Sequence, residues 1–203
     1  MNKRLLPLWL AVFVFASSLQ ADERLAIVRS NGLLVFLPEV GGPNTYGTYL
    51  VPNELGRDEL DRFLYLGNPL QINFLPSSEL PDGFSRMSAP KKLEAFFEVE
   101  SRHLSQAFNQ GIAFSDIKPS SVWGVDYLTG TASFVNADGQ TIEIRITART
   151  AGEGILHAAY QPENPDSVTK TRAMVNRLLS SFELVRRPLT PDEAAKRAKE
   201  AQQ

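Results

Sequence analysis

Glu100 and His103 form the best fragment of a metal site in this sequence, because a carboxylate and an imidazole three residues apart share one face of a helix. Di-iron sites in helical bundles need this pair twice, together with two more carboxylates from neighbouring helices. The sequence contains the pair once. We therefore interpret Glu100 and His103 as a solvated polar pair, and we predict neither a metal ion nor a cofactor.

Other patterns that would support catalysis are incomplete. The chain has no cysteine and no Gly-x-Ser-x-Gly segment, and only His103 and His157 are candidate imidazole bases, so a catalytic triad is not indicated. We interpret His157, which falls on a predicted strand, as a structural or surface histidine. No Gly-Lys-Ser or Gly-Lys-Thr follows Gly41, Gly42 and Pro43, so these residues are predicted to form a turn and not a phosphate loop.

The acidic residues leave one alternative open. Asp116, Asp126 and Asp138 are too widely spaced for a calcium loop, whose ligands stand at alternate positions. Paired carboxylates of the glycosidase kind depend on a separation in space that a sequence does not contain. We predict no catalytic residue, and we keep a small envelope hydrolase or cell-wall-binding enzyme that uses carboxylates as an alternative function.

Three aromatic residues make up the predicted binding site. Trp123, Tyr127 and Tyr160 fall in a predicted antiparallel meander, where they could line an aromatic patch. The competing interpretation is a role in the core, because large aromatic side chains usually bury most of their surface.

The first 21 residues predict a cleavable signal peptide. Lys3 and Arg4 precede an apolar run over Leu5–Phe15 that is too short to span a bilayer, and small residues follow it. We prefer cleavage after Ala21 to cleavage after Ser18, because polar residues follow Ala21. The mature protein is therefore expected in the periplasm or secreted, without a lipid anchor because the chain has no cysteine.

Charge and composition narrow the class of partner. The chain has 21 Lys and Arg against 23 Asp and Glu, and loss of Lys3 and Arg4 with the signal takes the net charge from −2 to about −4. An acidic domain is not attracted to phosphate backbones, so we predict no nucleic-acid partner. We predict no membrane span after cleavage, a single domain at 22–187 and a solvated helical tail at 188–203.

Local patterns predict the elements of the first half. A hairpin is expected over 24–37 around Asn31 and Gly32, followed by a loop over 38–46 and a short strand over 47–51. Apolar residues at three- and four-residue spacing predict a helix over 57–66, and alternation predicts a strand over 70–75. An apolar stripe from Leu93 to Phe108 predicts the clearest helix.

The second half predicts a sheet and a closing helix. Strands are expected over 121–128, 131–136, 141–147 and 155–161, with two-residue turns at Thr129–Gly130 and Asp138–Gly139. Asn164 and Pro165 are predicted to begin a helix whose buried stripe ends at Phe182. These patterns predict an α+β fold in which an antiparallel β-sheet, a meander, is flanked by amphipathic helices.

The order of elements over 117–184 resembles the PsbP/Mog1-like superfamily. The resemblance is carried by the meander, the strand end Ala159-Tyr160-Gln161, the Pro-bearing cap and the helix end Leu178-Leu179-Ser180-Ser181-Phe182. It implies a Mog1/PsbP-like sandwich and a largely non-catalytic domain that binds proteins. No binding residue of the superfamily carries over, because the matching residues are structural, and the longer region 33–75 departs from its pattern.

The sequence therefore predicts an exported, periplasmic, non-catalytic domain that binds or assists the assembly of other proteins. We expect its partner to be a protein of the cell envelope, contacted through a sheet face or the loop over 38–46. An immunity-type partner of an envelope toxin is a further alternative that the sequence does not separate from this hypothesis. The sequence predicts no oligomeric state.

Overall fold

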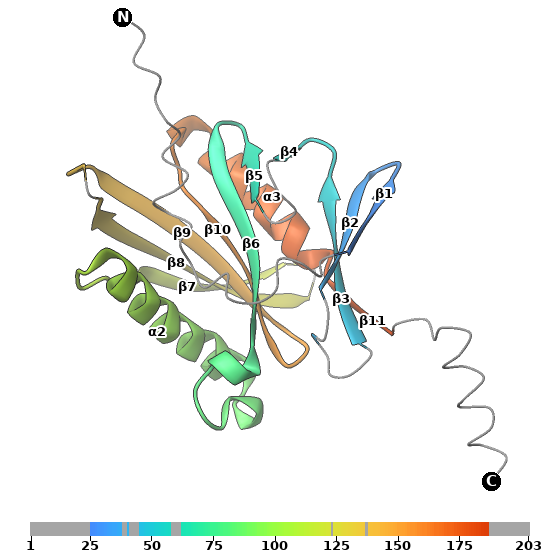
Figure 1. The fold of residues 1–203 in the computed structure, drawn as a ribbon, viewed down its shortest axis with the longest axis horizontal. Helices are drawn as coiled ribbons and strands as arrows, with labels where there is room; N and C mark the ends of the chain where they lie inside the picture. The colour runs from blue at the N-terminus through green and yellow to red at the C-terminus, as the bar shows by residue number, and fades with distance from the viewer. Residues whose placement is uncertain are drawn as a thin grey trace, which may run out of the picture.

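The computed structural model describes residues 25–37, 40, 45–57, 62–122, 124–136 and 138–186. The predicted signal peptide, the predicted tail at 188–203 and Trp123 lie outside these residues. The described part is α+β, with antiparallel sheets and amphipathic helices, which confirms the predicted fold class (Figure 1).

A large antiparallel sheet forms the centre of the described part, in the strand order β4-β5-β6-β10-β9-β8-β7. Its strands are β4 (Gly56–Arg57), β5 (Arg62–Tyr65), β6 (Asn68–Pro76), β7 (Ser115–Val122), β8 (Val125–Val135), β9 (Thr141–Ala151) and β10 (Gly154–Tyr160). A smaller antiparallel sheet, in the order β1-β2-β3-β11, contains β1 (Leu25–Arg29), β2 (Gly32–Leu37), β3 (Thr45–Pro52) and β11 (Glu183–Arg186).

Two α-helices cover opposite faces of the large sheet (Figure 1). The first, α2 (Ala89–Phe108), packs on β8 and β9. The second, α3 (Val168–Ser180), follows a single 3₁₀ turn at Pro165–Ser167 and contacts β9 and β10 as well as β3 of the small sheet. The layers are therefore α2, the large sheet, and α3 together with the small sheet.

The alternating direction of the side chains along β9 explains why both faces of the large sheet pack against other elements. Ile142, Ile144 and Ile146 are buried under α2, as the sequence pattern predicts. The intervening residues point to the opposite face, because successive side chains of a strand alternate. On that opposite face, β6 and β10 pack against α3 in a second core cluster that includes Ile72, Leu156 and Leu178.

The helix predicted over 57–66 is wrong. Described residues of this segment form β4 and β5, and β5 pairs with β6 through the register Tyr65↔Asn68. Leu66 and Gly67 both have positive φ, as the two-residue turns of β-hairpins require. Gly67 therefore lies in the turn of a hairpin and does not end a helix. Hydrogen bonding to the neighbouring strand outweighs the helical spacing of the few apolar residues in this segment.

The predicted turn at Thr129–Gly130 is also wrong, because β8 runs through it and pairs with β7. A Cβ on Gly130 would lie 2.6 Å from Phe97 Cε1 and 3.2 Å from Phe114 Cδ1. Gly130 is therefore a packing position, where two aromatic rings occupy the space of a side chain. The strand predicted over 121–128 spans the end of β7 and the start of β8, so the sequence pattern missed most of β7.

The connection between β8 and β9 is longer than the predicted two-residue turn. Pairing ends at Val135↔Thr141, so residues 136–140 form the loop. Its backbone is held by Asn136 Oδ1, which accepts hydrogen bonds from the N–H groups of Asp138 (3.0 Å) and Gln140 (2.9 Å). This is the local turn chemistry of asparagine.

The predicted loop over 38–46 falls largely outside the described residues. It ends earlier than expected, because Tyr46 belongs to β3. Within it, Val40 is fully buried, and its carbonyl accepts a hydrogen bond of 3.0 Å from Glu153 N.

Candidate functional site

Tyr127 and Tyr160 of the predicted aromatic site are both buried, at 1% and 2% exposure. They lie in the same core cluster, on β8 and β10, but Tyr127 interacts with Arg149, whereas Tyr160 is the direct neighbour of Arg145 on β9. Tyr127 lines an open groove on the α2 side of the large sheet, whereas Tyr160 lines a small polar pocket on the opposite side. The structure therefore associates the two tyrosines with different cavities.

The groove lies between the first half of α2 and the edge hairpin β7–β8 (Figure 1). Its main part has a volume of about 640 Å³, and a second part of about 370 Å³ continues from it. Glu94 and Ile117 line both parts, so the two parts form one elongated groove, which we call the α2–β7 groove.

The floor of the α2–β7 groove is apolar. Leu93 and Leu128 come from α2 and β8, and Ile117 on β7 leaves 44% of its surface exposed. In the second part, Phe97 and Phe114 meet edge to face at 4.9 Å between ring centroids. A concave, mostly apolar surface of this volume is typical of a binding site.

The charges around the groove have one sign. Glu94 and Glu98 stand on α2 one helical turn apart, and Asp126 stands on β8. None of the described lining residues is basic. The groove therefore combines an apolar floor with an acidic rim.

Hydrogen bonds hold the two walls of the groove together. Beyond the end of α2, Gln110 Nε2 donates to Val135 O (2.6 Å), and Gln110 Oε1 accepts from Val135 N (3.3 Å). Ser105 Oγ accepts a hydrogen bond of 2.9 Å from Ile112 N. These contacts connect the segment between α2 and β7 to α2 and to the end of β8, so the groove is preformed.

The interpretation of Glu100 and His103 as a solvated polar pair is correct for the pairing and wrong for the solvation of Glu100. The two side chains approach to 3.9 Å, but the Glu100 side chain is only 6% exposed and is therefore not solvated. Burial, and secondarily the negative charge of Glu79, raises the pKa of Glu100 to about 7. Among the described residues, no three His, Asp or Glu side chains are grouped as a metal ion would require.

His157 is a core residue in the structure. Its ring packs against Phe96 at 4.8 Å between centroids, and burial lowers its pKa to about 3. A histidine that stays neutral and closed to solvent does not serve as a general base for an external substrate.

Sequence reasoning did not find the α2–β7 groove, because β7 was not predicted. One signal was present: Glu94 and Glu98 stand at helical spacing on the face opposite the apolar stripe. That pattern is also what any solvated helix face shows.

No family model and no curated protein matches the sequence. Among solved structures, the chain is similar to cyanobacterial PsbP (CyanoP) from Synechocystis sp. PCC 6803. The match has 13% identity and a TM-score of 0.43, and it covers 73% of this chain and 89% of that chain. None of the described helices is long and apolar enough to cross a membrane.

Proposed function

We propose that this chain is an exported, non-catalytic protein-binding domain whose α2–β7 groove takes a basic, apolar segment of a partner protein. The observation that carries the proposal is the combination of an apolar floor with an acidic rim in one preformed groove. Complementary charge selects the partner and orients it, while burial of apolar side chains supplies most of the affinity.

The size of the groove supports a peptide segment as the occupant. A small-molecule pocket typically encloses its ligand, whereas this groove is open along its length between a helix and an edge strand. Ile117 lies where the two parts of the groove meet, and its exposed surface is the natural contact for an apolar side chain of the partner.

A synthetic peptide of alternating lysine and leucine, with a fluorescent label, provides the first test. We expect saturable binding of this peptide by fluorescence anisotropy, and at least about tenfold weaker binding of the peptide in which glutamate replaces lysine. Equal binding of the two peptides, or no binding of either, would contradict the proposal.

Two surface variants test whether the peptide binds in the α2–β7 groove. Ile117→Lys puts a positive charge in the groove and is expected to abolish binding of the lysine peptide. Leu64→Lys is the matched control, because Leu64 of β5 is similarly exposed, at 43% against 44%, and does not line the groove. Equal loss in both variants would show non-specific adsorption, and no loss in either would place the peptide elsewhere.

Export is the second part of the proposal and is supported by the order of charged, apolar and small residues over 1–21. Mass spectrometry of the full gene product, expressed in a bacterial host and recovered from the periplasmic fraction, tests it. A mass that corresponds to cleavage after Ala21 is expected. The uncleaved mass in the cytoplasmic fraction would overturn this part and leave the groove untouched.

A carboxylate enzyme is the second candidate function, because Glu94 and Asp126 line the same groove from opposite walls. Incubation of the protein with purified peptidoglycan separates the two candidates. Release of soluble fragments that both Glu94→Gln and Asp126→Asn abolish would replace the binding proposal with a hydrolase; the binding proposal predicts no release.

A further inference from the structure

A small polar pocket of about 170 Å³ lies on the face of the large sheet turned away from α2. Its floor is a row of side chains across three strands, in which Thr131 of β8 and Tyr160 of β10 are both direct neighbours of Arg145 on β9. The volume is well above the roughly 10–15 Å³ that one water molecule requires. We call this cavity the arginine pocket.

Hydroxyl groups and one further cation complete the walls. Thr129 and Thr147 form the next row of the sheet, directly beside Thr131 and Arg145. Lys118 of β7 borders the pocket, and its carbonyl accepts a hydrogen bond from Thr129 Oγ1 (3.2 Å). The wall thus combines hydroxyls, ammonium and guanidinium groups with one carboxylate, that of Asp116.

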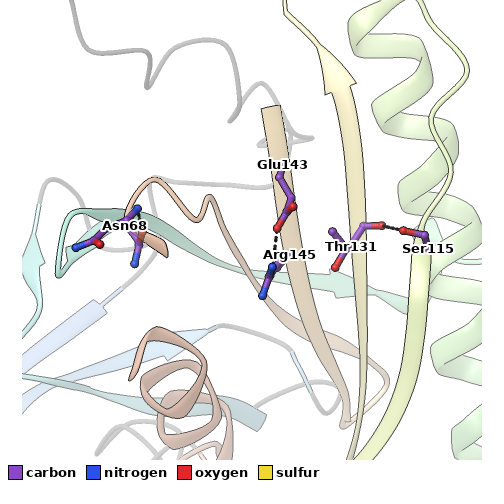
Figure 2. Close-up of polar contacts among 6 residues, drawn as sticks. Asn68, Ser115, Thr131, Glu143 and Arg145 are labelled. Carbon is purple, nitrogen blue, oxygen red and sulfur yellow. Dashed lines mark hydrogen bonds and ion pairs between the residues drawn. The ribbon is translucent and has the colours of Figure 1, made fainter. Parts of the chain in front are cut away.

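Arg145 is held in position by a neighbour on its own strand. Its Nε donates to Glu143 Oε1 at 2.7 Å, as Figure 2 shows beside the Ser115–Thr131 hydrogen bond that ties β7 to β8. This contact uses one of the five N–H donors of the guanidinium. A fixed guanidinium loses less side-chain entropy when it binds a ligand.

The positive charges of the pocket are only partly neutralised. The Lys118–Asp116 pair, at 3.5 Å, has both side chains 72% exposed and is therefore weak. Arg172 of α3 forms no ion pair with a carboxylate of the described residues. Arg145 pairs with Glu143 at 2.7 Å, so Arg172 supplies most of the positive charge that remains for a ligand.

Arg145 and Arg172 both line the pocket together with Tyr160. Burial raises the pKa of the Tyr160 phenol, and the positive charges of the two arginines oppose that rise. Arg is the side chain that best matches the two oxygens of a carboxylate or phosphate group.

We propose that the arginine pocket binds a small oxyanion, the carboxylate or phosphate group of a ligand, at Arg145 and Arg172, with the hydroxyls of Thr131 and Thr147 as further donors. The site lies on the opposite face of the sheet from the α2–β7 groove and does not depend on the function proposed for that groove.

Titration of the ¹⁵N-labelled full chain with sodium phosphate or sodium acetate, at constant ionic strength set by sodium chloride, tests the proposal by NMR. At least one of the two anions is expected to cause saturable shifts in the amides of Thr129, Thr131 and Thr147. Which anion saturates identifies the source of the oxyanion. Shifts that rise linearly with both anions, or that chloride reproduces, would overturn it.

Arg172→Ala and Arg177→Ala supply the matched pair of variants. Both arginines stand on α3, but Arg177 pairs with Glu54 at 3.5 Å and does not line the pocket. Loss of one charge-assisted contact is expected to weaken anion binding about tenfold or more in Arg172→Ala, and Arg177→Ala is expected to bind like the wild type. Equal affinities in the two variants would also overturn the proposal.

Discussion

Asn68 Nδ2 donates a hydrogen bond of 2.7 Å to Thr171 Oγ1, which joins the β5–β6 hairpin to α3. The same nitrogen donates to Ser167 Oγ at 2.7 Å, and Asn68 Oδ1 accepts from Asn164 N at 2.9 Å. Asn68 is fully buried. One amide thus positions the helix that packs between the two sheets.

Replacement of this amide is expected to destabilise the protein strongly. Asn68→Ala leaves the Asn164 N–H without its acceptor, and the hydroxyls of Ser167 and Thr171 lose the donor that they share. We expect a loss of roughly 2–4 kcal/mol in the free energy of unfolding. Urea denaturation measures it. Asn53→Ala is the control, because Asn53 is exposed and its side chain donates one hydrogen bond, to Ser30 O (3.0 Å); similar losses in both variants would contradict the role of the buried network.

Gly130→Ala is expected to disturb the groove as well as the core. The new Cβ would lie 2.6 Å from Phe97 Cε1, so the ring must move, and overpacking of this kind costs about 1–3 kcal/mol. Thermal unfolding and binding of the lysine peptide provide the two measurements. Gly111→Ala, at a glycine with no atom within 4 Å of the added Cβ, is expected to change neither.

Glu100 makes stability fall as the pH rises. Its pKa is raised from 4.5 to about 7, so between these values the folded protein holds a proton that the unfolded chain has released. Above pH 7 the penalty is roughly 3 kcal/mol, because one pKa unit corresponds to about 1.4 kcal/mol. Glu100→Gln is expected to stabilise the protein at pH 8 and to change little at pH 4. Urea denaturation at both pH values measures this, with Glu98→Gln as the exposed control on the same helix.

The shifted pKa of His157 makes stability fall as the pH decreases, which is the opposite of the effect of Glu100. Its pKa is lowered from 6.5 to about 3, so between these values the unfolded chain binds a proton that the folded protein excludes. Stability is therefore lost as the pH falls below 6.5. His157→Leu is expected to flatten this acid limb in denaturation curves recorded from pH 4 to pH 7; an unchanged slope would show that other groups cause it.

The elements that the sequence predicted correctly carry their signal locally. On α2, the apolar stripe from Leu93 to Leu104 repeats at helical spacing, and on β9 three isoleucines alternate with polar residues. Each pattern reports which face of one element is buried, and tertiary contacts agree with it. The aromatic binding site predicted from the sequence does not form one surface, because Tyr127 and Tyr160 lie in the core and border different cavities.

The sequence by itself determined the α+β class, the position of α2 and α3 and the buried face of β9, because periodicity along a chain is enough to define them. Only the tertiary structure decided that 62–65 is a strand, since its partner β6 supplies the hydrogen bonds. It likewise decided the role of Gly130, which depends on Phe97 and not on its chain neighbours. The α2–β7 groove needs Glu94, Ile117 and Asp126 on one surface, and only the packing of α2 on the large sheet brings them there.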